Sequence, residues 1–125
     1  MEEKTGARIL IVDDDGGVRE LLNLLLEDRG YELTSVDNAT DALEHLRLHD
    51  VDLMLLDKNL PDMNGLDLLR RLTSIDRRPT VIVMSAHASF AAADEAMKLG
   101  VADFLVKPFE DISYVLERVQ KALAG

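Results

Sequence analysis

Three carboxylates stand where apolar runs of the chain end. Asp13 and Asp14 follow the run 9–12, and Asp57 follows the run 53–56. If these runs are neighbouring strands, the three acids meet, and like charges so close raise each other's pKa unless a cation joins them. Mg²⁺ prefers oxygen ligands and uses few carboxylates, whereas Ca²⁺ wants more protein oxygens. The pattern therefore predicts a Mg²⁺ site, with Mn²⁺ as an alternative ion.

A hydroxyl and an ammonium group follow two further apolar runs. Ser85 comes after residues 80–84, and Lys107 comes after residues 102–106. A lysine supplies a positive point charge that suits a phosphoryl oxygen, and a serine supplies a hydrogen-bond donor. Together with a metal-bound carboxylate they would form a phosphoryl-transfer site, in which positioning and charge neutralisation do most of the work. Asp57 would be the nucleophile and would form an aspartyl phosphate.

These side chains need strands to position them, and the chain supplies five apolar runs in alternation with helical patterns. The run 51–57 is apolar on both faces, as in a strand covered by helices on both sides. The last helix is expected to bury its residues at spacings of three and four: Ile112, Val115, Leu116, Val119 and Leu123. The expected strands are 8–12, 31–36 (an edge strand), 51–57, 80–84 and 102–106. The first expected helix ends at 29, the second begins after the N-cap Asn38, the third spans 66–74, the fourth ends at 99 and the fifth spans 111–124.

Strict alternation with short loops predicts an α/β fold, a doubly wound five-stranded parallel sheet with five helices and right-handed crossovers. The flavodoxin-like order 2-1-3-4-5 places a switch point between the first and third strands, where ligands bind at the carboxyl edge. Asp13, Asp14 and Asp57 would meet there. We expect a single domain over residues 1–125, with a polar lead at 1–6 and no output domain.

Composition narrows the classes of partner. A formal net charge of −10 disfavours direct contact with nucleic acid or anionic lipid, and the chain has no cysteine for a thiolate metal site or a disulfide. The first apolar run is too short for a signal peptide or a membrane span. A cytoplasmic location is expected.

The motifs resemble the receiver domain of bacterial two-component response regulators. The matching stretches cover the chain in the family's order: 9–15, 55–57 with 60–65, 84–86 and 103–109. The resemblance implies that Asp57 is the phosphoacceptor and that Asp13 and Asp14 are the metal-site acids. It also implies that the backbone carbonyl of Asn59 completes the Mg²⁺ shell.

The same resemblance assigns roles outside the metal shell. Ser85 and Lys107 would bind the phosphoryl group, and Phe104 would be the switch aromatic. Asn59 and His87 stand where side chains influence the rate of hydrolysis in the family, although His87 could equally be an exposed loop imidazole. Lys58 adds a positive charge beside the site, and its side chain would extend either to the phosphoryl group or to solvent.

The resemblance also implies partners. The phosphodonor would be a histidine kinase or a phosphotransfer protein in a phosphorelay. A second copy or an output domain would dock on the surface formed by the fourth helix, the fifth strand and the last helix. The run 95–100 is similar to receivers of ATPase-type transcriptional activators, which would place the chain in transcription regulation.

Three other functions compete with this one. A Mg²⁺-dependent aspartyl-phosphate phosphatase of the haloacid dehalogenase type would need a second acid at position 59, where the chain has Asn59. A flavodoxin-like electron carrier would need a hydroxyl-rich phosphate loop where residues 13–15 are all acidic. A phosphorylation-independent interaction module would not need the intact acidic site. The chain would not be an enzyme in the ordinary sense, although it would assist its own phosphorylation and dephosphorylation.

Overall fold

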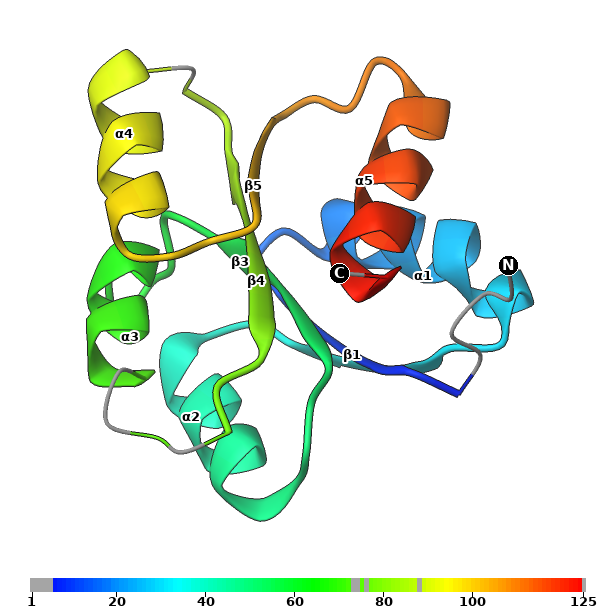
Figure 1. The fold of residues 1–125 in the computed structure, drawn as a ribbon, viewed down its shortest axis with the longest axis horizontal. Coiled ribbons are helices and arrows are strands. Elements are labelled where there is room, and N and C mark those ends of the chain that lie inside the picture. Colours follow the sequence, from blue (N-terminus) through cyan, green and yellow to red (C-terminus); the bar gives the residue numbers. More distant parts are fainter. Residues whose placement is uncertain (1–5, 73–74, 76, 88, 125) are drawn as a thin grey trace.

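The computed structural model describes residues 6–72, 75, 77–87 and 89–124, and Figure 1 shows its fold. Most of the predicted polar lead and the end of the helix predicted over 66–74 lie outside these residues. The described strands form one parallel sheet in the order β2-β1-β3-β4-β5, as predicted. Their bounds are Arg8–Val12 (β1), Glu32–Val36 (β2), Leu53–Asp57 (β3), Thr80–Ser85 (β4) and Asp103–Val106 (β5).

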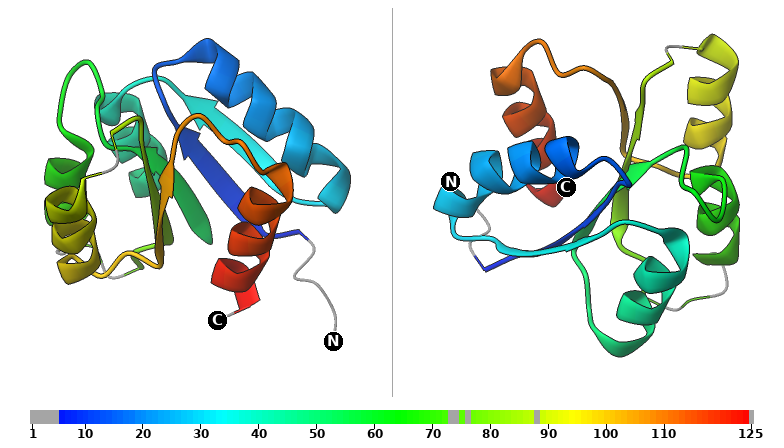
Figure 2. Two further views of the ribbon diagram at one scale, coloured as in Figure 1. Left: turned by 90° about the horizontal axis from the view of Figure 1, so that it is seen from above. Right: turned by 180° about the vertical axis from the view of Figure 1, so that it is seen from behind.

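Helices cover both faces of this sheet, and the two views of Figure 2 show the layers. The first and last helices pack on one face, and the other three pack on the opposite face. The helices are Gly16–Leu26 (α1), Ala39–Leu48 (α2), Gly65–Leu72 (α3), Phe90–Lys98 (α4) and Ile112–Ala124 (α5). A parallel sheet needs this cover because right-handed crossovers place a helix over each pair of strands.

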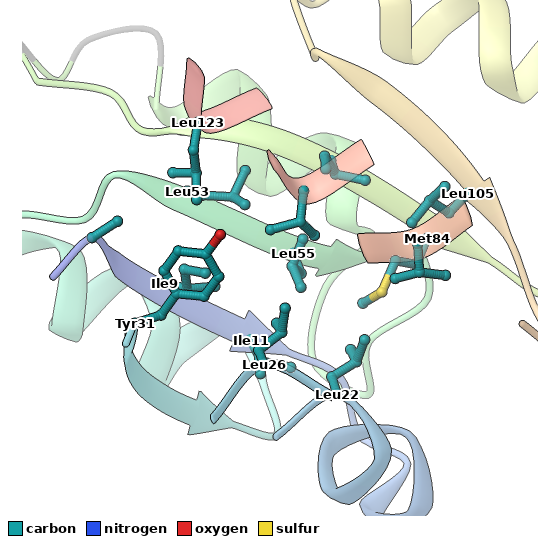
Figure 3. Packing of buried hydrophobic residues seen from close by; sticks show 14 residues of the cluster. Ile9, Ile11, Leu22, Leu26, Tyr31, Leu53, Leu55, Met84, Leu105 and Leu123 are labelled. Carbon is teal, nitrogen blue, oxygen red and sulfur yellow. The ribbon is translucent and has the colours of Figure 1, made fainter. Parts of the chain in front are cut away.

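The sheet divides the apolar core into two clusters. Figure 3 shows the first, in which Ile9, Leu55 and Met84 of the sheet face Leu22 and Leu26 of α1 and side chains of α5. The second cluster lies on the other face, against α2, α3 and α4. Alternation along each strand sends successive side chains to opposite clusters. All of β3 is buried, as predicted, whereas the edge strand β2 is partly exposed.

Local signals set the ends of several helices. Asn38 caps α2 by accepting the backbone N–H of Asp41, as predicted. Gly30 and Gly100 have φ of 82° and 86°, a left-handed conformation that costs glycine little. The helix expected up to residue 29 ends instead at Leu26 and tightens into a 3₁₀ turn, Glu27–Arg29, as helix ends often do.

One predicted core residue is not buried. Ile112 is 43% exposed, whereas Val115, Val119 and Leu123 are in the core. The spacing of the apolar residues in α5 is correct, but Ile112 is the first residue of the helix and the packed part begins one turn later. Periodicity identifies the face of a helix without showing where its contact with the sheet starts.

Candidate functional site

The predicted side chains come together at the carboxyl edge of the sheet. Backbone hydrogen bonds extend the strand pairing just past the strand ends: Lys58 N–H donates to the Met84 carbonyl at 2.8 Å, and Lys107 N–H donates to the Ser85 carbonyl at 2.8 Å. Asp13 N–H donates to the Val36 carbonyl at 3.2 Å. The residues that follow β1, β3 and β5 are thus held in register at this edge.

Asp13, Asp14 and Asp57 converge, as predicted from the order of the strands. One carboxylate oxygen from each lies within 4.8 Å of the others. Asp13 is fully buried and Asp57 is 4% exposed, whereas Asp14 is exposed to solvent. A set of three carboxylates with one open side fits a hard divalent cation that keeps several waters. This is the only group of at least three metal-ligating side chains found among the described residues.

Lys107 already has a partner in this site. Its Nζ lies 2.8 Å from Asp13 Oδ2 and 3.6 Å from Asp57 Oδ2. Burial alone would lower the pKa of Lys107, but the hydrogen bond to Asp13 and the charges of both acids outweigh burial and raise it. The ammonium group is therefore held charged between the two buried acids.

Asp57 is the acid with a perturbed pKa. Burial raises the pKa of this carboxyl group from 3.8 to about 6, and the charge of Asp13 acts in the same direction. The Asn59 N–H, which donates to Asp57 Oδ1 at 3.2 Å, and the charge of Lys107 both oppose the rise. Near pH 7 the carboxylate is still mostly ionised, which is the form that a nucleophile requires.

The hydroxyl group of Ser85 is engaged with the loop that follows β4. Ser85 is buried; its Oγ donates to the His87 carbonyl at 3.2 Å and accepts the His87 N–H at 3.1 Å. His87 itself is exposed. Phe104 is half-buried and packs against the second core cluster, the face of the sheet that carries α4. Strand alternation places Ser85 on that same face.

The loop between β3 and α3 returns closely to β3. Asn59 pairs with Asn64 in an antiparallel bridge, and Gly65 N–H donates to the Lys58 carbonyl at 2.6 Å. A Cβ on Gly65 would lie 2.4 Å from the Asp57 carbonyl oxygen. Only glycine allows this approach, so Gly65 sets the path of the loop that carries Asn59.

Two residues near the site were not predicted from the sequence. Arg19 Nη1 donates to the Asp13 carbonyl at 2.7 Å and so supports the backbone of that acid. Asp62 accepts the N–H groups of Ala39 and Thr40 at 2.9 Å each and the Thr40 hydroxyl at 2.7 Å. These bonds lower the pKa of Asp62 to about 2. Neither contact is indicated by residue type or spacing, since Arg19 reaches back six residues to the Asp13 carbonyl and Asp62 bonds to backbone 22 and 23 residues away.

Comparisons with known proteins agree with this geometry. The family model described as response regulator receiver domain matches residues 9–120. The sporulation initiation phosphotransferase F of Bacillus subtilis is 37% identical, over 93% of this chain and 93% of its own length. The DNA-binding transcriptional regulator NtrC of Rhizobium meliloti is 38% identical over 96% of this chain, which spans 25% of that protein. The CheY-like receiver domain of Methanospirillum hungatei JF-1 has a TM-score of 0.86 at 29% identity, over 94% of each chain.

The chain belongs to the receiver domain family of two-component response regulators, and its role is phosphoacceptor signalling. No described helix combines the length and the apolar character that a membrane crossing requires.

Proposed function

We propose that Asp57 is the phosphoacceptor of this receiver domain. The observation that carries the proposal is the position of Asp57 at the end of the fully buried strand β3, with two further acids and an ammonium group around it. The donor would be a phosphohistidine of a histidine kinase or phosphotransfer protein. A carboxylate oxygen of Asp57 would attack the phosphorus atom, the P–N bond would break, and the imidazole would leave with that electron pair.

The surrounding residues would neutralise the charge of the transferred group. Asp13, Asp14, Asp57 and the backbone carbonyl of Asn59 would hold Mg²⁺, or Mn²⁺ in its place, which neutralises charge on phosphoryl oxygens when bound. Lys107, now 2.8 Å from Asp13 and 3.6 Å from Asp57, would donate to a phosphoryl oxygen after a small movement. The side chains of Asn59 and His87 are both exposed, and they would set the rate of hydrolysis by controlling access of water.

Ser85 and Phe104 would convert phosphorylation into a change of surface. The Ser85 hydroxyl would leave the His87 carbonyl and donate to the phosphoryl group, because a hydrogen bond to a charged acceptor contributes about 1.5–3 kcal/mol against about 0.5–1.5 kcal/mol for a neutral one. Phe104 would then move inward beside β4. Phosphorylation would shift a pre-existing equilibrium by its difference in affinity for the two states.

The surface of α4, β5 and α5 would be the output surface. Several large apolar side chains are exposed there, among them Phe90 (90% exposed), Val106 and Tyr114. A second copy of the chain or an output domain would bind this surface. We propose that the chain acts in the cytoplasm as a receiver domain within transcription regulation and that it does not turn over an external substrate.

Phosphorylation with a small-molecule donor tests the assignment. Incubation with acetyl phosphate and Mg²⁺ should add one phosphoryl group, seen by intact-protein mass, and EDTA should suppress the reaction. Asp57→Asn should abolish it, while Asp50→Asn, at the opposite edge of the sheet, should leave it unchanged. Undiminished phosphorylation of the Asp57→Asn protein would disprove the role of Asp57.

The switch is tested separately with beryllofluoride, which mimics the phosphoryl group. Spectra or structures with and without it should show the Ser85–His87 bond broken, Phe104 moved inward and self-association changed. If Ser85, Phe104 and the oligomeric state are the same in both forms, the switch does not operate in this chain, even if Asp57 is phosphorylated.

A further inference from the structure

Two of the three histidines in the chain lie together at the C-terminal end of α2. The rings of His45 and His49 are 4.5 Å apart between centroids, with 29° between their planes. Residues four apart share one face of a helix. His49 is the C-cap residue, and its N–H donates to the His45 carbonyl at 2.9 Å, so the last helical turn that holds both rings is closed.

Both rings line an open hollow of about 390 Å³. Its other walls come from the first residues of β1, from β2 and from the loop after α2; Arg8, Glu32 and Asp50 are the charged residues among them. Glu32 lies 3.8 Å from Arg8, and Asp50 lies 2.8 Å from Arg77. This is the amino edge of the sheet, opposite the edge that carries Asp57.

The two rings are close together but stacked, with 29° between their planes, so their nitrogen atoms do not point at one position in this conformation. At least one side chain must turn about its own bonds before both rings can bind one ion. Two histidines four residues apart on one helical face are a spacing that holds a single Zn²⁺ in proteins, so the backbone spacing suits a shared ion.

We propose that His45 and His49 form a binding site for a divalent transition-metal ion of the class of Zn²⁺, Ni²⁺ or Cu²⁺, with water at the remaining positions. Imidazole suits these ions, whereas Mg²⁺ and Ca²⁺ prefer oxygen. Burial and the neighbouring His49 both lower the pKa of His45, which favours the neutral form that binds metal. The net charge of −10 also attracts cations to this protein.

This site is independent of the proposed phosphoacceptor site. The two lie at opposite edges of the sheet and differ in ligand type, oxygen at the acidic edge and imidazole nitrogen at the hollow. His45→Gln and His49→Gln should therefore leave phosphorylation with acetyl phosphate unchanged. Failure of one proposal would not affect the other.

Titration with Ni²⁺, followed by NMR of the imidazole protons, tests the proposal. The protein must carry no histidine tag, and Mg²⁺ in millimolar excess should be present to occupy the acidic site. Paramagnetic Ni²⁺ should broaden the His45 and His49 signals together, at ion concentrations below that of the protein. In His49→Gln, the same broadening of the His45 signal should require at least tenfold more Ni²⁺ than in the parent protein. In His45→Gln, the His49 signal should likewise require at least tenfold more Ni²⁺.

The third histidine provides the matched control. His87→Gln removes one imidazole at the other edge of the sheet and should leave the response of the His45 and His49 signals unchanged. Both ring positions are at the surface or half-buried, so the glutamine variants should keep their fold, which far-ultraviolet circular dichroism would verify. If His45 responds at the same Ni²⁺ concentration in His49→Gln as in the parent, the two rings do not bind one ion, and the proposal is wrong.

Discussion

The ammonium group of Lys107 is closer to Asp13 than to the proposed phosphoacceptor, at 2.8 Å from Asp13 Oδ2 against 3.6 Å from Asp57 Oδ2. Asp13 is fully buried, and the ammonium group of Lys107 is the cation that contacts its carboxylate in this structure. The pair thus stabilises the acidic site before a cation or a phosphoryl group arrives, and it keeps Lys107 within a short movement of Asp57.

Replacing Lys107 by methionine should therefore destabilise the metal-free protein. Removing one member of a buried ion pair leaves an uncompensated charge, and the expected loss is about 2–4 kcal/mol in the free energy of unfolding. Added Mg²⁺ should recover part of the loss, because the ion would neutralise the same carboxylates. Urea unfolding with EDTA and with Mg²⁺ measures both effects. Lys121→Met, on the exposed side of α5, is the control, and an equal loss in the two variants would contradict the role of the pair.

Asp57 should make stability depend on pH. Its pKa is about 6 in the folded protein against an ordinary value of 3.8, so between these values the folded chain binds more protons than the unfolded chain. The free energy of unfolding of the metal-free protein should then fall as pH rises through this window, by no more than about 3 kcal/mol.

The test compares the parent protein with Asp57→Asn in EDTA. The asparagine variant cannot titrate at this position, so its stability relative to the parent should increase as pH rises from 4 to 7 in this experiment. Acids that lie far from Asp57 titrate alike in both proteins and cancel in the difference. A constant difference across the window would show that the pKa of Asp57 is not raised.

Asp14 should matter for metal binding more than for folding. Its side chain is exposed, so Asp14→Ala should change the stability of the metal-free protein by no more than about 0.5 kcal/mol. The parent should gain about 2.7 kcal/mol from Mg²⁺ at one hundred times its Kd, and the variant should gain much less at the same concentration. Thermal unfolding with and without Mg²⁺ measures this. An unchanged Mg²⁺ effect would place the ion elsewhere.

Gly65 should tolerate no side chain. An added Cβ would meet the Asp57 carbonyl oxygen at 2.4 Å, so Gly65→Ala should force the loop away from β3 and cost about 1–3 kcal/mol. It should also slow phosphorylation, because the loop carries Asn59. Gly16→Ala is the matched control, since a Cβ there would meet its nearest neighbour, the Arg19 side chain, at 3.5 Å. Equal stability of the two alanine variants would contradict the close approach.

The fold and the meeting of the acids could be predicted because both follow from periodicity and chain order. Apolar runs that end at Asp13 and Asp57 define parallel strands, and the order of the strands then brings the two acids together. The resemblance to receiver domains added roles for Asn59, His87 and Phe104 that spacing alone does not assign.

The details that were missed depend on contacts between distant parts of the chain. Asp62 bonds to backbone 22 and 23 residues away, and Lys107 pairs with an acid 94 residues away. The Ser85 hydroxyl bonds to the backbone of its own loop, and the presence of a serine at this position does not predict that bond. Ile112 was placed on the correct face of α5 but beyond the packed part. Such contacts depend on where helices, strands and loops pack against one another. A pattern of residue types does not predict these positions.

The division of the core by the sheet has a consequence for how a signal would travel. By strand alternation, Asp13, Asp57 and Lys107 continue the side of the sheet that faces α1 and α5, whereas Ser85 and Phe104 lie on the side that faces α4. A change of charge at Asp57 would not be passed on through the packed strands. It would reach the Ser85 hydroxyl around the carboxyl edge, where the Lys107 N–H bonds to the Ser85 carbonyl and the backbone itself joins the two sides.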